Sequence, residues 1–113
     1  MKRGLLILTV ALVFLTFDAN PTDAGTTPLV TITKVDVRND GTFLVDISQP
    51  TTGAPPCATV TNRLSANANT AGGKAILQLA ISAYLSGRPV DFDGTGTCSE
   101  FSNIESIARI AAH

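Results

Sequence analysis

The sequence contains no tryptophan and only one histidine, His113, at its end. Nucleophilic hydrolysis usually needs a base that a third group positions, and a terminal histidine is poorly placed for that role. Zinc sites combine several cysteine and histidine ligands, but Cys57 and Cys98 have neither a second cysteine pair nor an internal histidine beside them. We therefore expect no enzyme, no cofactor and no metal centre.

A large net charge is also missing, and aromatic residues are few. Lysine and arginine number 8 against 9 aspartates and glutamates, the formal net charge is −1, and aromatic residues make up 5% of the chain. Nucleic-acid binding calls for a basic surface and exposed aromatic rings, and charge-driven lipid binding also needs basic residues. The composition predicts neither activity.

Acidic residues do occur in pairs, within and after the stretch DFDGTGTCSE. A calcium loop of the EF-hand type would need an oxygen ligand at its first position, where this alignment places Pro89. We expect instead that Asp91 and Asp93 share one face of a strand. Acid pairs such as Glu100 with Glu105 are common on solvated surfaces, so these pairs do not by themselves indicate catalysis.

The stretch TAGGKA places Gly73 and Lys74 before a helix, as a phosphate-binding loop would. Ala68 occupies the position of the first required glycine, and Ala75 that of the metal-binding serine or threonine. The stretch is therefore predicted to be an ordinary helix start with a solvated lysine.

Residues 1–24 have the pattern of a secretory signal peptide. Lys2 and Arg3 precede an apolar run from Leu5 to Phe17, which is shorter than the roughly 20 residues of a membrane-spanning helix. Cleavage after Ala24 fits best, because small residues precede it. We expect a secreted or periplasmic protein of residues 25–113, folded as one domain and not inserted in a membrane.

The two cysteines, Cys57 and Cys98, both lie in the predicted mature chain. An even count in an oxidising compartment indicates a disulfide. Closing a loop of roughly 40 residues stabilises a domain by roughly 4 kcal/mol, a large share of the total for so short a chain.

The segment LVTITKVDVR, residues 29–38, predicts a first strand because its β-branched residues alternate. The alternation slips once, and a β-bulge near Thr33 and Lys34 would correct it. With that bulge, four aliphatic residues face the core: Val30, Ile32, Val35 and Val37. The turn residues 39–41 then predict a hairpin to a second strand that carries Phe43, Val45 and Ile47 inward.

Later segments complete the expected order of elements. Residues 58–64 predict a third strand, followed by the connector SANANT and by a helix from about Ala71 to Ser86, which Asn69 or Thr70 caps and Gly87 ends. Residues 88–94 predict a fourth strand. Residues 104–111 predict a fifth strand, with a short helix as the alternative.

The predicted fold is therefore mainly β with one helix, in the order β-β-β-α-β-β. A bent first strand, and a helix between the third and fourth strands, match a five-stranded OB-fold-like barrel.

The predicted helix is too apolar for one contact face. At 100° per residue its polar residues occupy an arc of about 120°, which leaves roughly 240° apolar, whereas one packed face needs little over 100°. We expect part of it to contact another subunit, although alanine-rich flanks that tolerate water are the alternative. The expected oligomer residues are Ile76, Leu77, Leu79, Ile81 and Leu85.

The run GKAILQLAISAYLSGRPVDFDGTGTCSEFSNIESI resembles a pattern in small secreted bacterial proteins of unknown function. That pattern consists of GKA, an apolar helix, SG, Val, GTGTC and a later glutamate. These proteins are distantly similar to the OB-fold B subunits of AB5-type toxins, which are secreted, disulfide-containing pentamers that bind host glycans. The resemblance implies an oligomeric subunit that binds glycans or cell surfaces. None of the toxins' glycan-contacting residues has a counterpart by position.

Two functions follow as expectations. The first is a non-enzymatic secreted binding module that recognises a glycan, a cell-surface ligand or a protein through loops such as the proline-rich residues 49–56. The alternative is a structural or assembly protein of the bacterial envelope with no small-molecule ligand.

Overall fold

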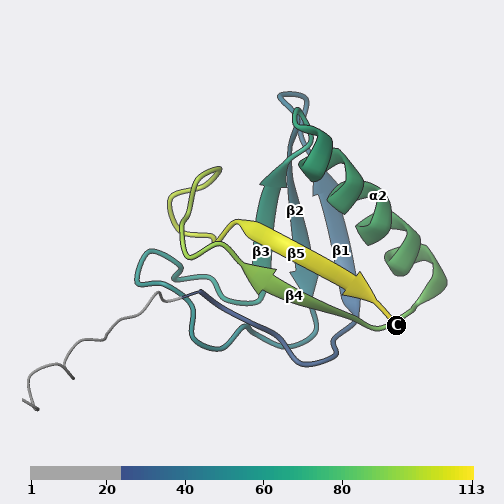
Figure 1. The fold of residues 1–113 in the computed structure, drawn as a ribbon, viewed down its shortest axis with the longest axis horizontal. Helices are drawn as coiled ribbons and strands as arrows, with labels where there is room; N and C mark the ends of the chain where they lie inside the picture. The colour runs from purple at the N-terminus through teal and green to yellow at the C-terminus, as the bar shows by residue number, and fades with distance from the viewer. Residues whose placement is uncertain (1–23) are drawn as a thin grey trace, which may run out of the picture.

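The computed structural model describes residues 24–113, so the predicted signal peptide lies outside the described residues except for Ala24. Within these described residues, five strands and one helix follow the predicted order β-β-β-α-β-β (Figure 1). The elements are β1 (Ile32–Val37), β2 (Thr42–Ile47), β3 (Arg63–Asn67), α2 (Ala71–Ser86), β4 (Val90–Gly94) and β5 (Ile107–Ala112). No helix within residues 24–113 is long and apolar enough to cross a membrane.

The first hairpin contains the predicted bulge. The register of β1 against β2 shifts between Ile32 and Lys34, and Gly41 closes the turn at a φ of 94°. That φ lies in the left-handed region, which glycine adopts without steric cost. The prediction that Val37 faces the core is wrong, because this last residue of β1 lies beside the turn and is 52% exposed.

The third strand begins later than predicted. It covers Arg63–Asn67 rather than residues 58–64, and it pairs antiparallel with all but the end of β2. Residues 58–62 form a loop, although Thr61 and Asn62 still accept backbone hydrogen bonds from Thr51 and Ile47. The small residues of SANANT were predicted to be a connector, yet Ser65 is fully buried in β3.

The helix has the predicted bounds and caps. Thr70 Oγ1 accepts a hydrogen bond from the amide of Gly73 at 2.9 Å, and Gly87 ends α2 in the left-handed conformation at a φ of 71°. Both caps satisfy backbone groups that a helix end leaves free. α2 packs against β1, β3 and β5, so it bridges the two sheets.

The strands form two sheets, β1-β2-β3 and β4-β5. The C-terminal segment is a strand, as predicted, and begins at Ile107. Single bridges join the sheets: Val30 with Val90 in antiparallel orientation, and Ser65 with Ser106 in parallel orientation. The ladders do not form a closed barrel within residues 24–113.

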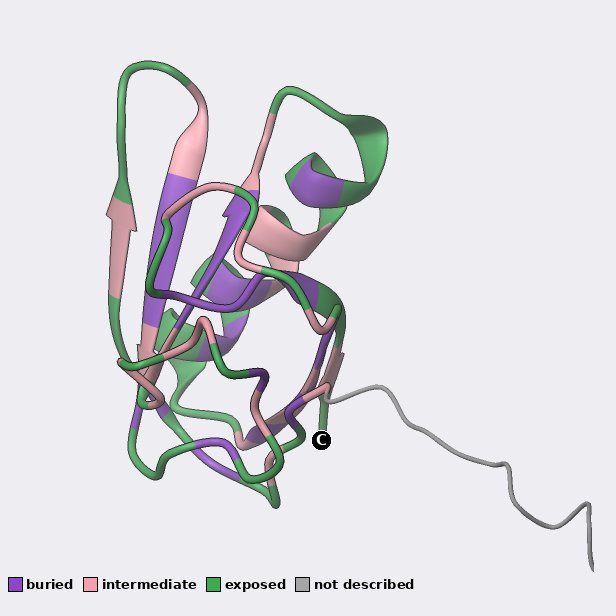
Figure 2. Cartoon of the chain, turned by 90° about the vertical axis from the view of Figure 1, so that its left-hand side faces the viewer, coloured by how far each residue is buried: buried purple, intermediate pink, exposed green. Residues whose placement is uncertain are grey.

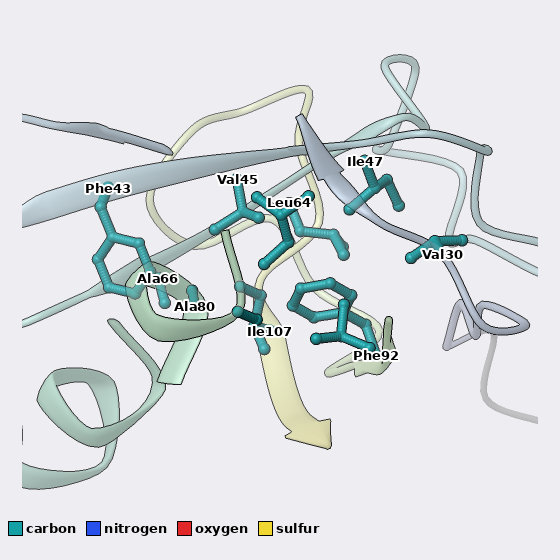
Figure 3. Packing of buried hydrophobic residues seen from close by; sticks show 12 residues of the cluster. Val30, Phe43, Val45, Ile47, Leu64, Ala66, Ala80, Phe92 and Ile107 are labelled. Atoms are coloured by element: carbon teal, nitrogen blue, oxygen red, sulfur yellow. The ribbon is translucent and has the colours of Figure 1, made fainter. Parts of the chain in front are cut away.

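A single core lies between the two sheets and under the helix, where the inward faces of the strands are buried (Figure 2). Its largest side chains are Phe43, Leu64 and Phe92, none more than 1% exposed. Figure 3 shows that side chains from strands of both sheets and from α2 converge in this interior. The core therefore holds together two sheets that share few backbone hydrogen bonds.

Candidate functional site

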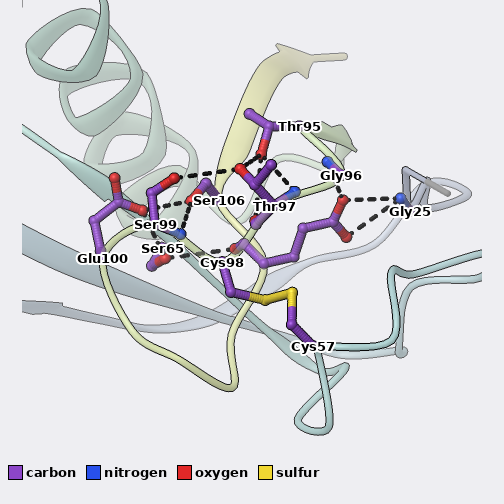
Figure 4. The surroundings of a disulfide bond; sticks show 11 residues. Gly25, Cys57, Ser65, Thr95, Gly96, Thr97, Cys98, Ser99, Glu100 and Ser106 are labelled. Atoms are coloured by element: carbon purple, nitrogen blue, oxygen red, sulfur yellow. Dashed lines mark hydrogen bonds between the residues drawn. A yellow bond between two sulfur atoms is a disulfide. The ribbon is translucent and has the colours of Figure 1, made fainter. Parts of the chain in front are cut away.

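The predicted disulfide is present. Cys57 and Cys98 are bonded, with their Cα atoms 6.3 Å apart, and no free cysteine remains among the described residues (Figure 4). The bond joins the loop after the proline-rich stretch to the connection between β4 and β5, residues 95–106. We call this connection the β4–β5 loop.

The β4–β5 loop forms one wall of a cavity of about 340 Å³. The rest of its lining comes from the end of β3, the start of α2 and the start of β5, and none of the lining residues belongs to the proline-rich residues 49–56. We call this cavity the polar pocket, because its lining includes Asn67, Thr70, Thr95, Ser99, Glu100 and Ser106.

Two buried hydroxyl groups position the carboxylate of the polar pocket. Ser65 Oγ donates to Glu100 Oε1 at 3.0 Å, and Ser106 Oγ donates to the same oxygen at 2.7 Å (Figure 4). The amide of Ser99 donates to Ser106 Oγ at 3.1 Å, which helps to fix that hydroxyl. Within residues 24–113, Glu100 Oε2 accepts no hydrogen bond. One oxygen thus orients the carboxylate, which belongs to the lining of the polar pocket.

A second cavity, of about 350 Å³, lies between α2 and β5. We call it the apolar groove; its lining is Gly72, Ala75, Ile76, Leu79, Ala108, Arg109 and Ile110. Gly72, Ile76 and Ala108 also line the polar pocket, so the two cavities are neighbours. Together the two cavities present hydroxyl and carboxylate groups to a ligand at one end and aliphatic surface at the other.

The predicted oligomer residues fall on two sides of α2. Ile76, Leu77 and Leu79 are half-buried, and two of these three line the apolar groove. Ile81 is 38% exposed and Leu85 77% exposed. Together with Tyr84, these two residues form an exposed apolar patch, which we call the outer flank.

Asp91 and Asp93 share the solvent-facing side of β4, as predicted, while Phe92 is buried between them. Arg109 on β5 binds both carboxylates, and His113 Nε2 donates to Asp91 Oδ2 at 2.6 Å. The hydrogen bond from His113, followed by that from Arg109, lowers the pKa of Asp91. Basic partners therefore occupy both carboxylates.

Potential metal ligands are dispersed in the fold. No group of three or more histidine, cysteine, aspartate or glutamate residues in the described part of the chain could hold a metal ion. The calcium-loop alignment that sequence reasoning set aside would have combined Asp91 and Asp93 with Glu100. The two aspartates instead pair with β5, whereas Glu100 lines the polar pocket.

Glu105 differs from the solvated acid that the sequence suggested, because it is only 1% exposed. Its carboxylate accepts hydrogen bonds from the amides of Gly25, at 3.2 and 3.0 Å, and of Gly96, at 2.9 Å. An ideal Cβ on Gly94 would lie 2.0 Å from Glu105 Oε2. The lack of a side chain at Gly25 and Gly94 makes room for the carboxylate. This was the one sequence signal for its burial.

No family model matches the sequence, and the search of curated proteins found no match. The chemistry of the polar pocket and the exposed surfaces must therefore carry the functional argument.

Proposed function

We propose that this chain is a secreted, non-enzymatic binding module whose polar pocket takes a polyhydroxylated ligand, a glycan at the cell surface. The observation that carries the proposal is the carboxylate of Glu100, which Ser65 and Ser106 orient through one oxygen while the other stays free. A fixed carboxylate is a strong acceptor for ligand hydroxyl groups. Preorganisation of this kind lowers the ordering cost of binding.

The size and lining of the two cavities suit such a ligand. The polar pocket, at about 340 Å³, lies at the lower end of the roughly 300 to 1,000 Å³ typical of ligand sites. Asn67, Thr70 and Thr95 add amide and hydroxyl groups to its lining. The apolar groove beside it provides aliphatic contact for the C–H surface of a sugar or for the group attached to it.

The strand arrangement supports an OB-fold-like barrel. The ladders give the orders β1-β2-β3 and β4-β5, and two single bridges lie at their margins: Ser65 of β3 with Ser106, next to β5, in parallel orientation, and Val30, before β1, with Val90 of β4. Five strands in a partly open barrel, with loops that bind oligosaccharides, describe the OB-fold. The distant resemblance to toxin B subunits points to the same fold and ligand class.

Secretion is supported by two features. The N-terminal sequence has the order of a signal peptide, and the disulfide between Cys57 and Cys98 is typical of exported proteins. A secreted or periplasmic location places the polar pocket where glycans of cell surfaces occur.

A glycan array probed with the mature, oxidised protein tests the binding proposal. Reproducible hits are expected, and Glu100→Gln should abolish or weaken them at least tenfold, because it replaces a charged acceptor in the pocket. Asp36→Asn is the matched control: it removes the same charge from β1, and Asp36 lines neither cavity. A silent array, or hits that Glu100→Gln leaves unchanged, would refute the proposal.

The outer flank supports a second role, assembly with further copies of this chain. Ile81, Tyr84 and Leu85 are exposed together on α2, which is where an apolar contact between subunits would form. A homo-oligomer with no small-molecule ligand would be a structural protein of the envelope. An oligomer that gives a silent array supports that alternative over the binding module.

Light scattering tests assembly. Leu85→Glu should dissociate the oligomer, whereas Gln78→Glu, on the polar side of α2, should leave it intact. A wild-type protein that is monomeric at micromolar concentration would refute the assembly proposal.

A further inference from the structure

Glu105 is a buried carboxylate without a cation. It is 1% exposed, and no lysine, arginine or histidine within residues 24–113 forms an ion pair with it. Its hydrogen-bond donors are the backbone amides of Gly25 and Gly96. Buried carboxylates are costly unless a positive charge or several strong donors compensate them. The structure therefore buries the carboxylate of Glu105 without a cation that balances its charge.

The nitrogen of Gly25 lies where a cation would balance the charge of Glu105. It is 3.2 Å from Glu105 Oε1 and 3.0 Å from Glu105 Oε2, so one amide proton is shared between two acceptors. An ammonium group at the same place could give each oxygen its own proton.

Backbone hydrogen bonds hold this part of the chain in place. The amide of Gly94 donates to the carbonyl of Gly25 at 2.8 Å, and Thr26 exchanges two backbone hydrogen bonds with Thr52, both 2.9 Å long. These contacts involve residue 25 and later residues only. The nitrogen of Gly25 would therefore keep its position if the chain began there.

We propose that export cleaves the chain between Ala24 and Gly25, and that the new α-ammonium group of Gly25 forms a buried ion pair with Glu105. In this step a signal peptidase adds water across the peptide bond. The leader leaves with the carboxylate of Ala24, and the nitrogen of Gly25 becomes a protonated amine. Maturation thus supplies the charge that the folded domain lacks.

The residue after the cut must be small for this pairing. An ideal Cβ on Gly25 would lie 2.6 Å from Glu105 Oε1 and 3.1 Å from Thr51 Cβ. Any side chain there would push the carboxylate away from the nitrogen. The small residues that precede this position in the leader favour the same cleavage site independently of Glu105.

The first test is the N-terminus of the exported protein. Intact mass and N-terminal sequencing of protein purified from the exported fraction should give Gly25 as the first residue. A start elsewhere would overturn the proposal. Because this test reports on processing alone, its outcome is distinct from that of the glycan array.

The second test is a double-mutant cycle in urea unfolding. It compares protein that begins with a free Gly25 and the same protein acetylated at Gly25, each with Glu105 or with Glu105→Gln. Acetylation makes the nitrogen of Gly25 an amide again, as it is in the structure. The acetylated and free forms therefore differ at this nitrogen in charge. With Glu105, the free terminus should raise the folding equilibrium constant about tenfold over the acetylated terminus; with Glu105→Gln this advantage should vanish.

Equal stability of the free and acetylated forms that carry Glu105 would overturn the proposal. That comparison needs no substitution, so it remains decisive even if Glu105→Gln fails to fold. An advantage of the free terminus that persists in Glu105→Gln would also overturn it, since the stabilisation would then come from another partner.

Discussion

The two adjacent glycines at the start of α2 have opposite surroundings, and we predict that alanine at each will change stability in opposite directions. An ideal Cβ on Gly73 would lie 1.8 Å from the backbone oxygen of Asn67 and 2.7 Å from its carbonyl carbon. An ideal Cβ on Gly72 would meet nothing within 4 Å. Because the obstacle at Gly73 is backbone, no side-chain rotation can relieve the clash, and α2 or the end of β3 must move.

The expected change in the free energy of unfolding has two contributions, helix propensity and steric overlap. Alanine is favoured over glycine inside a helix by about 1 kcal/mol, and by less near the end of a helix. Gly72→Ala should therefore stabilise the fold by about 0.5 kcal/mol. Gly73→Ala gains the same term but forces apart packed backbone, which costs about 3 kcal/mol at the upper end of overpacking. Its net destabilisation should be about 2.5 kcal/mol.

Urea unfolding followed by far-UV circular dichroism measures both changes. The two variants have the same composition and mass, so each is the control for the other. Their difference of about 3 kcal/mol corresponds to roughly 12 to 24 °C in Tm for a domain of this size. Equal stability of Gly73→Ala and Gly72→Ala would show that α2 does not begin against the end of β3. The described position of this part of the polar pocket would then be refuted.

Three further predictions concern the disulfide, the helix cap and a surface carboxylate. Replacing both Cys57 and Cys98 by alanine should cost about 4 kcal/mol in urea unfolding, because the bond spans a sequence separation of 41; a loss below about 1 kcal/mol would contradict this. Thr70→Ala should cost about 1 kcal/mol by the same assay, while Thr70→Ser should keep most of the cap; equal losses would show that the hydroxyl is not the cap. The pKa of Asp91 is lowered from 3.8, so its contacts stabilise the fold above that pH, and this contribution is lost as the pH falls through the lowered value. His113→Ala should raise the titration midpoint of the Asp91 carboxyl group in NMR, and an unchanged midpoint would refute the role of the imidazole.

Signals that act between near neighbours were readable from the sequence. Thr70 caps α2 and Gly87 ends it because a helix end needs an acceptor and a left-handed residue within one turn. The bulge before Lys34 was readable because it preserves the alternation of aliphatic residues within one strand. In each case the signal lies within a few neighbouring residues of one element, so no knowledge of the tertiary fold was needed.

The bounds of β3 depended on partners far away in the sequence. Ser65 and Ala66 have weak strand propensity, yet both are buried, and they pair with Leu44 and Phe43 of β2. The amide of Ser65 also donates to the carbonyl of Glu105, across the bridge between the two sheets. Such close approach favours small residues, which from sequence alone look like a connector.

The polar pocket could not be predicted for the same reason. Its lining comes from β3, the start of α2, the β4–β5 loop and the start of β5, and only the folded chain brings these together. From the sequence, the proline-rich residues 49–56 were one candidate binding loop. Glu100 and Glu105 were taken for a solvated pair, although they turn to different surroundings.

The different surroundings of these two acids let one loop carry both the proposed ligand site and the proposed contact with the mature chain terminus. Glu100 faces the polar pocket, whereas Glu105 reaches the amide of Gly96 at the other end of the same β4–β5 loop. Cys98, between Gly96 and Glu100, ties the loop to the rest of the domain through the disulfide. Three covalent or hydrogen-bonded anchors thus limit the motion of a segment that has no regular secondary structure. An ion pair between Gly25 and Glu105 would strengthen one of these anchors, so maturation would make the pocket wall more rigid as well as the fold more stable.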